Sequence, residues 1–278
     1  MKKLFSLLAF LLLLTCVAGA SGADGYDKTG DYQYDILPDG TAEIVAYLGY
    51  DRNVVVPSRL SGHPVTSIGA TSFSECSGII FLTIPEGVIS IGPYAFEGCL
   101  DLSSVTLPES LQTIGTYAFM GCDGLTSVSI PDSVTTVGDN PFLSCLSLTE
   151  FRVSSKHPYL SVVDGALVRK SDQTLIAYPG GSTEKQYRIP NGIRAIGNDA
   201  LACCNHLTSV TIPEGVRSIG SEAFAWSRNL STVTVPSSVV SIGENAFFDC
   251  SGLRSVNVGT NAYAKQYCVD NGLPLAAK

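Results

Sequence analysis

The sequence is poor in charged residues and in the residue types that most often perform chemistry. Only 15% of its 278 residues are Asp, Glu, Lys or Arg, and it contains one Trp, two Met and three His. The net charge of −8 argues against binding nucleic acid or anionic lipid through bulk electrostatics. No G-x-S-x-G, H-E-x-x-H, P-loop or G-x-G-x-x-G motif occurs. The commonest signatures of hydrolases, metalloproteases and nucleotide-binding enzymes are therefore missing.

What the sequence does have is apolar residues, glycine and proline. Hydrophobic residues make up 45% of the chain, which excludes a disordered protein, and there are 27 Gly and 14 Pro. This composition favours many short strands and tight turns over long solvated helices.

The first twenty residues have the pattern of a secretory signal peptide. Lys2 and Lys3 precede an apolar run over residues 4–14, and Ala18-Gly19-Ala20 is a small-x-small cleavage site. Without the two lysines the net charge becomes −10. A lipoprotein signal ending at Cys16 is the alternative, although Thr15 stands where such signals usually carry a small residue. No later stretch is apolar and long enough to span a bilayer. We therefore expect an extracellular or cell-surface protein, with residues 21–31 as a flexible tether.

A repeat of 23 residues organises the remainder. Its units begin at Val65, Val88, Leu111, Val134, Ile193, Val216 and Val239, so residues 65–156 hold repeats 1–4 and residues 193–260 hold repeats 5–7. Six units read close to V-x-x-I-G-x-x-A-F-x-x-C-x-x-L-x-x-V-x-I-P. Leu-type positions at such a period predict a leucine-rich repeat solenoid, because one unit cannot bury its apolar face alone.

The repeat motifs VTSIGATSF, VISIGPYAFEGC, LQTIGTYAFMGC and VVSIGENAFFDC resemble the BspA-type leucine-rich repeat family of secreted and surface proteins. The resemblance extends from about Tyr32 to the end of the chain. It implies the solenoid fold, and it implies a role in adhesion or in binding host or matrix proteins.

Each repeat position has a mechanical reason. The V-x-I segment alternates apolar and polar residues, so it predicts one strand per coil and a parallel sheet along one side. The Pro that follows ends the strand. The repeated Gly is expected to need a positive φ or a close approach to the neighbouring coil. Ala-Phe is expected to begin a short helical turn on the other side, with a stacked aromatic spine of Phe73, Phe96, Phe119, Phe142, Phe224 and Phe247, and with Leu201 replacing one member.

Three segments depart from the repeat. Residues 157–192 carry hairpin signals around Asp164-Gly165 and Ser171-Asp172 and add one extra rung. Residues 32–64 form a β cap with a turn at Asp39-Gly40, and residues 261–278 form a C-terminal cap with a short helix over 262–269. Nine strands with eight gaps of about 4.8 Å then predict one sheet about 38 Å long.

Eight cysteines remain after the predicted leader, and six of them share one repeat position: Cys76, Cys99, Cys122, Cys145, Cys204 and Cys250. Ser227 fills the seventh place. We expect small buried thiols there, with disulfides between neighbouring coils as the alternative. A zinc site at Cys203-Cys204-Asn205-His206 is the weaker alternative, because a metal needs four converging ligands.

One place on the outward face of the sheet breaks a ladder of Ser and Thr. Arg152 and Arg188 are expected on neighbouring rungs, flanked by Glu150, and close to the hairpin insertion. They are candidate binding residues for an anionic group such as a carboxylate or sulfate, because paired guanidinium groups hold such groups well. The alternative is that they are salt-bridged surface residues.

The sequence predicts no catalytic residue, no metal site and no cofactor. The function expected is a secreted, non-catalytic interaction or adhesion module, whose partner is a protein or glycan on a host, matrix or neighbouring cell surface. A glycan-active enzyme on a β-solenoid and a structural spacer without a ligand are the two alternatives.

Overall fold

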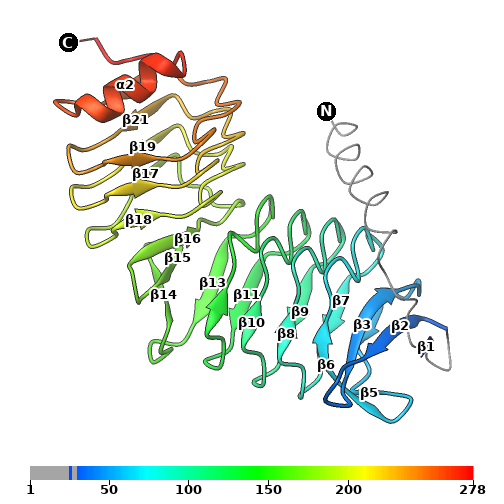
Figure 1. The fold of residues 1–278 in the computed structure, drawn as a ribbon. Coiled ribbons are helices and arrows are strands. Elements are labelled where there is room, and N and C mark those ends of the chain that lie inside the picture. Colours follow the sequence, from blue (N-terminus) through cyan, green and yellow to red (C-terminus); the bar gives the residue numbers. More distant parts are fainter. Residues whose placement is uncertain (1–24, 27–29, 278) are drawn as a thin grey trace.

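The computed structural model describes residues 25–26 and 30–277 and shows a solenoid of stacked coils. The predicted signal peptide, Cys16 and most of the predicted tether lie outside the described residues. The coils are capped at the start by a β-hairpin and at the end by a helix (Figure 1). No helix in the described part of the chain is long and apolar enough to cross a membrane.

The nine predicted strands are all present, one to a coil. They are β4 (Asn53–Val55), β7 (Phe81–Thr83), β9 (Ser104–Thr106), β11 (Ser127–Ile130), β13 (Glu150–Val153), β17 (Gln186–Arg188), β19 (Ser209–Thr211), β21 (Thr232–Thr234) and β23 (Ser255–Asn257). Neighbours pair in parallel, residue on residue, 23 positions apart, as in Val210↔Val233. The prediction of one continuous sheet is wrong, however. The strands form three sheets, β4-β7-β9, β11-β13 and β17-β19-β21-β23, and β13 does not pair with β17.

A second parallel ladder, which the sequence analysis did not predict, runs along the segment before each repeated Gly. Its members are β6 (His63–Ile68), β8 (Ser90–Ile91), β10 (Thr113–Ile114), β12 (Thr136–Val137), β18 (Ala195–Ile196), β20 (Ser218–Ile219) and β22 (Ser241–Ile242). Most of these strands have two residues, which is too short for an alternating pattern to be visible. Each repeat therefore carries two strand segments and one segment of turns.

The segment around Ala-Phe, which we call the turn side, consists of turns that are not α-helical. In the first repeat, the amides of Thr71, Phe73 and Glu75 donate to carbonyls of the next coil at 2.7–3.1 Å. The amides between them close turns onto residues three positions earlier. Thr71 and Glu75 have positive φ angles of 57° and 61°, which interrupt a helix. Every second amide thus joins neighbouring coils, so the turn side is hydrogen-bonded like the strands.

The predicted aromatic spine is confirmed. Phe73, Phe96 and Phe119 are fully buried, and the ring centroids of successive members lie 4.9–5.6 Å apart from Phe73 to Phe142. Phe224 and Phe247 continue it at 5.1 Å. At the start of the chain Tyr47 stacks on Phe73 at 5.0 Å and closes the spine.

The repeated Gly is required by close approach and not by positive φ. At Gly115, an added Cβ would lie 2.6 Å from the backbone of Gly92 and Pro93 in the preceding coil. Gly243 is in the same situation, with Ser221 N at 2.3 Å. Any side chain at these corners would force two coils apart.

Both predicted hairpins and the helix are present. β2 (Tyr32–Ile36) pairs antiparallel with β3 (Ala42–Tyr47), and β3 pairs with β6 to cap the first coil. The two-residue strand β1 (Gly25–Tyr26) extends this hairpin, and β5 (Arg59–Leu60) pairs with β6. In the insertion, β14 (Leu160–Val163), β15 (Ala166–Arg169) and β16 (Thr174–Ala177) form two hairpins. Helix α2 (Ala262–Asp270) begins at Asn261, whose side chain accepts from Ala264 N.

The insertion interrupts the stack and bends it. β16 pairs with β18, so the hairpins extend the C-terminal arm (residues 157–277), and neither ladder pairs across to the N-terminal arm (residues 30–156). The inserted coil runs from β16 to β17 through only a short turn, in which Ser182 N donates to Pro179 O at 3.2 Å, so its turn side is shorter than that of a repeat. Gly181 N donates to Leu148 O at 2.8 Å.

The turn sides of the two flanking repeats therefore touch. Asn198 donates to Asp139 although the two residues are 59 positions apart. An inserted coil that adds width on one side only acts as a wedge, and the stacking direction changes where β14–β16 lie (Figure 1).

Most cysteines at the shared repeat position form hydrogen bonds to backbone carbonyls and not disulfides. All eight cysteines in the described part of the chain are free. Cys99, Cys122, Cys145 and Cys250 each donate from Sγ to the carbonyl of the spine Phe 26 residues earlier, at 3.0–3.3 Å. Ser227 makes the same bond to Leu201 O at 2.9 Å, which explains why a hydroxyl replaces the thiol there.

Candidate binding surface

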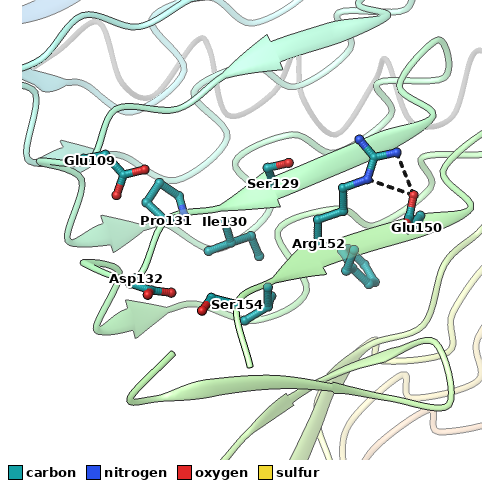
Figure 2. A pocket seen from close by; sticks show the side chains of 10 residues that line it. Glu109, Ser129, Ile130, Pro131, Asp132, Glu150, Arg152 and Ser154 are labelled. Carbon is teal, nitrogen blue, oxygen red and sulfur yellow. Dashed lines mark hydrogen bonds and ion pairs between the residues drawn. The ribbon is translucent and has the colours of Figure 1, made fainter. Parts of the chain in front are cut away.

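A hollow lies on the sheet side at the end of the N-terminal arm. Its volume is about 580 Å³, and its walls come from β11, β13, the turns that follow them and the turn after β9. Figure 2 shows Arg152 and Glu150 at one end of the hollow and the carboxylates of Glu109 and Asp132 at the other. Pro131 and Ile130 form apolar wall between them.

Arg152 and Glu150 form an ion pair along one strand. Their side chains point outward from β13 because they flank the inward-facing Phe151. Arg152 Nε and Nη2 lie 2.9 and 2.8 Å from Glu150 Oε2. Both side chains are more than half exposed, at 58% and 53%, so the pair adds little stability but holds the guanidinium in one orientation.

Arg188 does not join this pair. It lies exposed on β17, opposite Thr211 of β19, in the sheet of the C-terminal arm. The expectation that Arg152 and Arg188 occupy neighbouring rungs is wrong, because β13 and β17 are not paired. The physical reason is the wedge of hairpins that follows β13. A grip made of both guanidinium groups on one anion is therefore not formed.

Two other basic side chains near the insertion, those of Arg169 and Lys170, have local partners. Arg169 Nε lies 3.2 Å from Asp172 Oδ1 across the hairpin turn. Lys170 Nζ donates to the carbonyl of His157 at 2.5 Å. These contacts stabilise the hairpins and leave the basic groups dispersed.

Two of the three histidines make hydrogen bonds that serve the fold. His157 is fully buried, its Nδ1 accepts from the amides of Tyr159 and Leu160 at 3.1 Å, and its Nε2 lies 3.0 Å from Pro131 O. Burial lowers the pKa of His157. His63 Nδ1 lies 2.8 Å from Gly40 O at the tip of the first hairpin.

The thiols are placed for packing. Burial raises the pKa of Cys76 and Cys203 to about 11 and that of Cys250 to about 12, so the reactive thiolate form is disfavoured. Within residues 30–277 and the first strand, no group of three or more His, Cys, Asp or Glu side chains could hold a metal ion.

The bend contains a buried carboxylate that was not predicted from the sequence. Asp199 of the C-terminal arm is 4% exposed and accepts from the hydroxyl of Tyr117, in the N-terminal arm, at 2.5 Å. Asn140 Nδ2 donates to the backbone carbonyl of Asp199 at 2.8 Å. Burial raises the pKa of Asp199 to about 6, with a further contribution from Glu222 and Asp139. The one sequence signal for this contact is the position of Tyr117 directly before Ala118-Phe119, which places Tyr117 on the turn side.

Comparison with known families gives a match over most of the chain. The family model described as BspA type leucine rich repeat region matches six copies, over residues 58–162 and 180–275. The gap between the two ranges falls in the hairpin insertion. A search of curated proteins found no match.

Solved structures share the fold. A leucine rich cell surface protein from Faecalibacterium prausnitzii A2-165 is 23% identical, with a TM-score of 0.55 over 87% of this chain and 90% of that one. A leucine-rich repeat protein from Eubacterium ventriosum ATCC 27560 is 24% identical, with a TM-score of 0.65 over 83% and 71%. The leucine rich repeat protein of T. pallidum is 26% identical, with a TM-score of 0.50 over 91% and 98%.

Proposed function

Because the chain belongs to the BspA-type leucine-rich repeat family, we propose that it is a secreted, non-catalytic module that binds a partner outside the cell. The partner is a protein or glycan on a host, matrix or neighbouring cell surface. The proposal is supported by the signal-peptide pattern of residues 1–20 and by the similarity to a cell surface protein of Faecalibacterium prausnitzii.

The observation that carries the proposal is the hollow on the sheet side. It is where charged side chains replace the Ser/Thr ladder of the exposed face, and Glu150 already holds Arg152 in place. Glu150 engages only two nitrogens of the guanidinium, so Arg152 keeps N–H donors for a partner. Glu109 and Asp132 line the opposite end. This mixture of charges fits a protein surface with both signs better than a simple polyanion.

Arg188 is proposed as a second and independent contact, on the other arm. Because Arg152 and Arg188 lie on strands that do not pair, the free-energy losses caused by replacing each with Ala should add.

The experiment is capture of a partner from extracellular material by the mature chain, followed by affinity measurements on the captured partner. Arg152→Ala should weaken binding by about 1 to 3 kcal/mol, and less so at high salt. Arg254→Ala, which removes an exposed arginine beside β23, is the matched control and should bind as the wild type does. Unchanged affinity in Arg152→Ala would refute the role of the hollow.

A further inference from the structure

A second exposed surface lies on the turn side and is independent of the hollow. Tyr94 packs against Tyr117 with ring centroids 5.2 Å apart, and Trp226 packs edge-on against Phe248 at 5.8 Å. Together with Met120, these residues form what we call the aromatic strip. The strip crosses the bend, because Tyr117, Met120 and Trp226 all pack against the same small cluster of Leu143, Ala202 and Ala225.

The strip packs on the small cluster at the bend and is not among the residues that pack against the two main hydrophobic cores. The spine of Phe residues lies beneath it and is already buried, whereas Phe248 is 52% exposed and the other four strip residues are half-buried. Four of the five are aromatic at positions where other repeats carry small or polar residues, such as Thr71 in place of Tyr94 and Ser74 in place of Phe248. A contiguous apolar surface of this kind on a solenoid marks a place where another molecule packs.

The charge around the strip is negative. Glu97 lies beside Tyr94, and Asp139 and Glu222 lie beside the Tyr117–Asp199 pair. The basic residue near the C-terminal end of the strip, Arg228, is paired with Asp249 through two nitrogens. Carboxylates therefore outnumber basic side chains along the strip.

From this combination we infer that the aromatic strip is a docking surface for a lysine- or arginine-rich segment of a partner protein. Cationic side chains are attracted to the faces of Trp and Tyr rings, and the surrounding carboxylates add charge complementarity. The segment lies across both arms, so binding also braces the bend. This inference does not rest on the role proposed for Arg152.

The single tryptophan of the sequence makes the inference directly testable, since Trp226 belongs to the strip. The full chain is titrated with a synthetic peptide of alternating Arg and Gly, with a peptide of the same length carrying Glu in place of Arg, and with cellopentaose. We expect a saturable change in Trp226 emission with the Arg peptide alone, and weaker binding as salt is raised.

Phe248→Ala and Phe81→Ala form a matched pair, measured by calorimetry. Phe248 is 52% exposed on the strip and Phe81 is 53% exposed on the sheet side, so each change removes the same exposed ring. Phe248→Ala should lower the affinity for the Arg peptide about tenfold, as expected for a contact residue at an interface. Phe81→Ala should leave this affinity unchanged. Equal affinity in the two variants would overturn the inference, because binding would then reflect only the overall negative charge. Binding of cellopentaose but not of the Arg peptide would also overturn it, in favour of a glycan.

Discussion

Replacing Tyr117 by Phe tests the contact that joins the two arms at the bend. The hydroxyl of Tyr117 donates to Asp199 Oδ2 at 2.5 Å, and the ring itself packs in the turn-side cluster, so the substitution removes the donor and keeps the shape. A hydrogen bond to a charged group contributes about 1.5 to 3 kcal/mol, and one between neutral groups about 0.5 to 1.5 kcal/mol. The loss should therefore depend on whether Asp199 is ionised.

The pKa of Asp199 sets the pH window. In the folded protein it is raised to about 6 from the ordinary value of 3.8, chiefly by burial. Between these two values the folded state holds a proton that the unfolded state has released, so the free energy of unfolding falls as pH rises through the window. Two pH units correspond to at most about 3 kcal/mol, and partial access of solvent at the bend reduces this to about 1 to 2 kcal/mol.

Urea unfolding followed by circular dichroism near pH 4.5 and near pH 8 measures both effects. We expect Tyr117→Phe to cost about 2 kcal/mol near pH 8 and about 1 kcal/mol near pH 4.5, where Asp199 is mostly protonated. Asp199→Asn should remove the fall in stability across the window. Tyr94→Phe is the control, since Tyr94 packs on the same ring but makes no hydrogen bond to a carboxylate among the described residues. Equal losses for Tyr117→Phe at both pH values would refute the reasoning.

Four further predictions concern the aromatic spine, the repeated glycine, the thiols and the processing of the N-terminus. Phe119→Ala removes a fully buried spine ring and should cost about 3 to 5 kcal/mol while broadening or splitting the thermal transition, and a wild-type melting curve would contradict its place in the core. Gly115→Ala should lower the free energy of unfolding by more than about 2 kcal/mol because its Cβ meets backbone at 2.6 Å, whereas Gly87→Ala, at φ 100° with open space around it, should cost about 1 kcal/mol; equal losses would disprove the close approach. The six buried cysteines (Cys99, Cys122, Cys145, Cys204, Cys250 and Cys268) should react with a thiol reagent only after denaturation, and a melting temperature lowered by reductant would instead indicate disulfides. N-terminal sequencing of exported protein should give Ser21, and an acylated Cys16 would show that the lipoprotein alternative is right.

The sequence by itself determined the coil. Because each repeat stacks on a copy of itself, Val65, Gly69 and Phe73 face the same surroundings as their equivalents in every other repeat, and their periodicity is visible along the chain. The hairpins could be predicted for a different reason, since a dipeptide such as Asp164-Gly165 favours a tight hairpin turn by its own conformational preference. Arg152 and Glu150 were correctly placed side by side on one strand for the same local reason.

Only the tertiary structure decided what happens between the arms. The repeat pattern predicts contacts 23 residues apart, and it does not predict that the turn side of the inserted coil is shorter than that of a repeat. That difference in width separates Arg152 from Arg188, breaks both ladders, and brings Tyr117 to Asp199 across 82 positions. The aromatic strip also results from the insertion, because its two halves meet only where the turn sides of the flanking repeats touch. Contacts within a coil or between equivalent repeats are periodic and can be predicted from the sequence, whereas the bend depends on how two unequal sides of one coil pack in space.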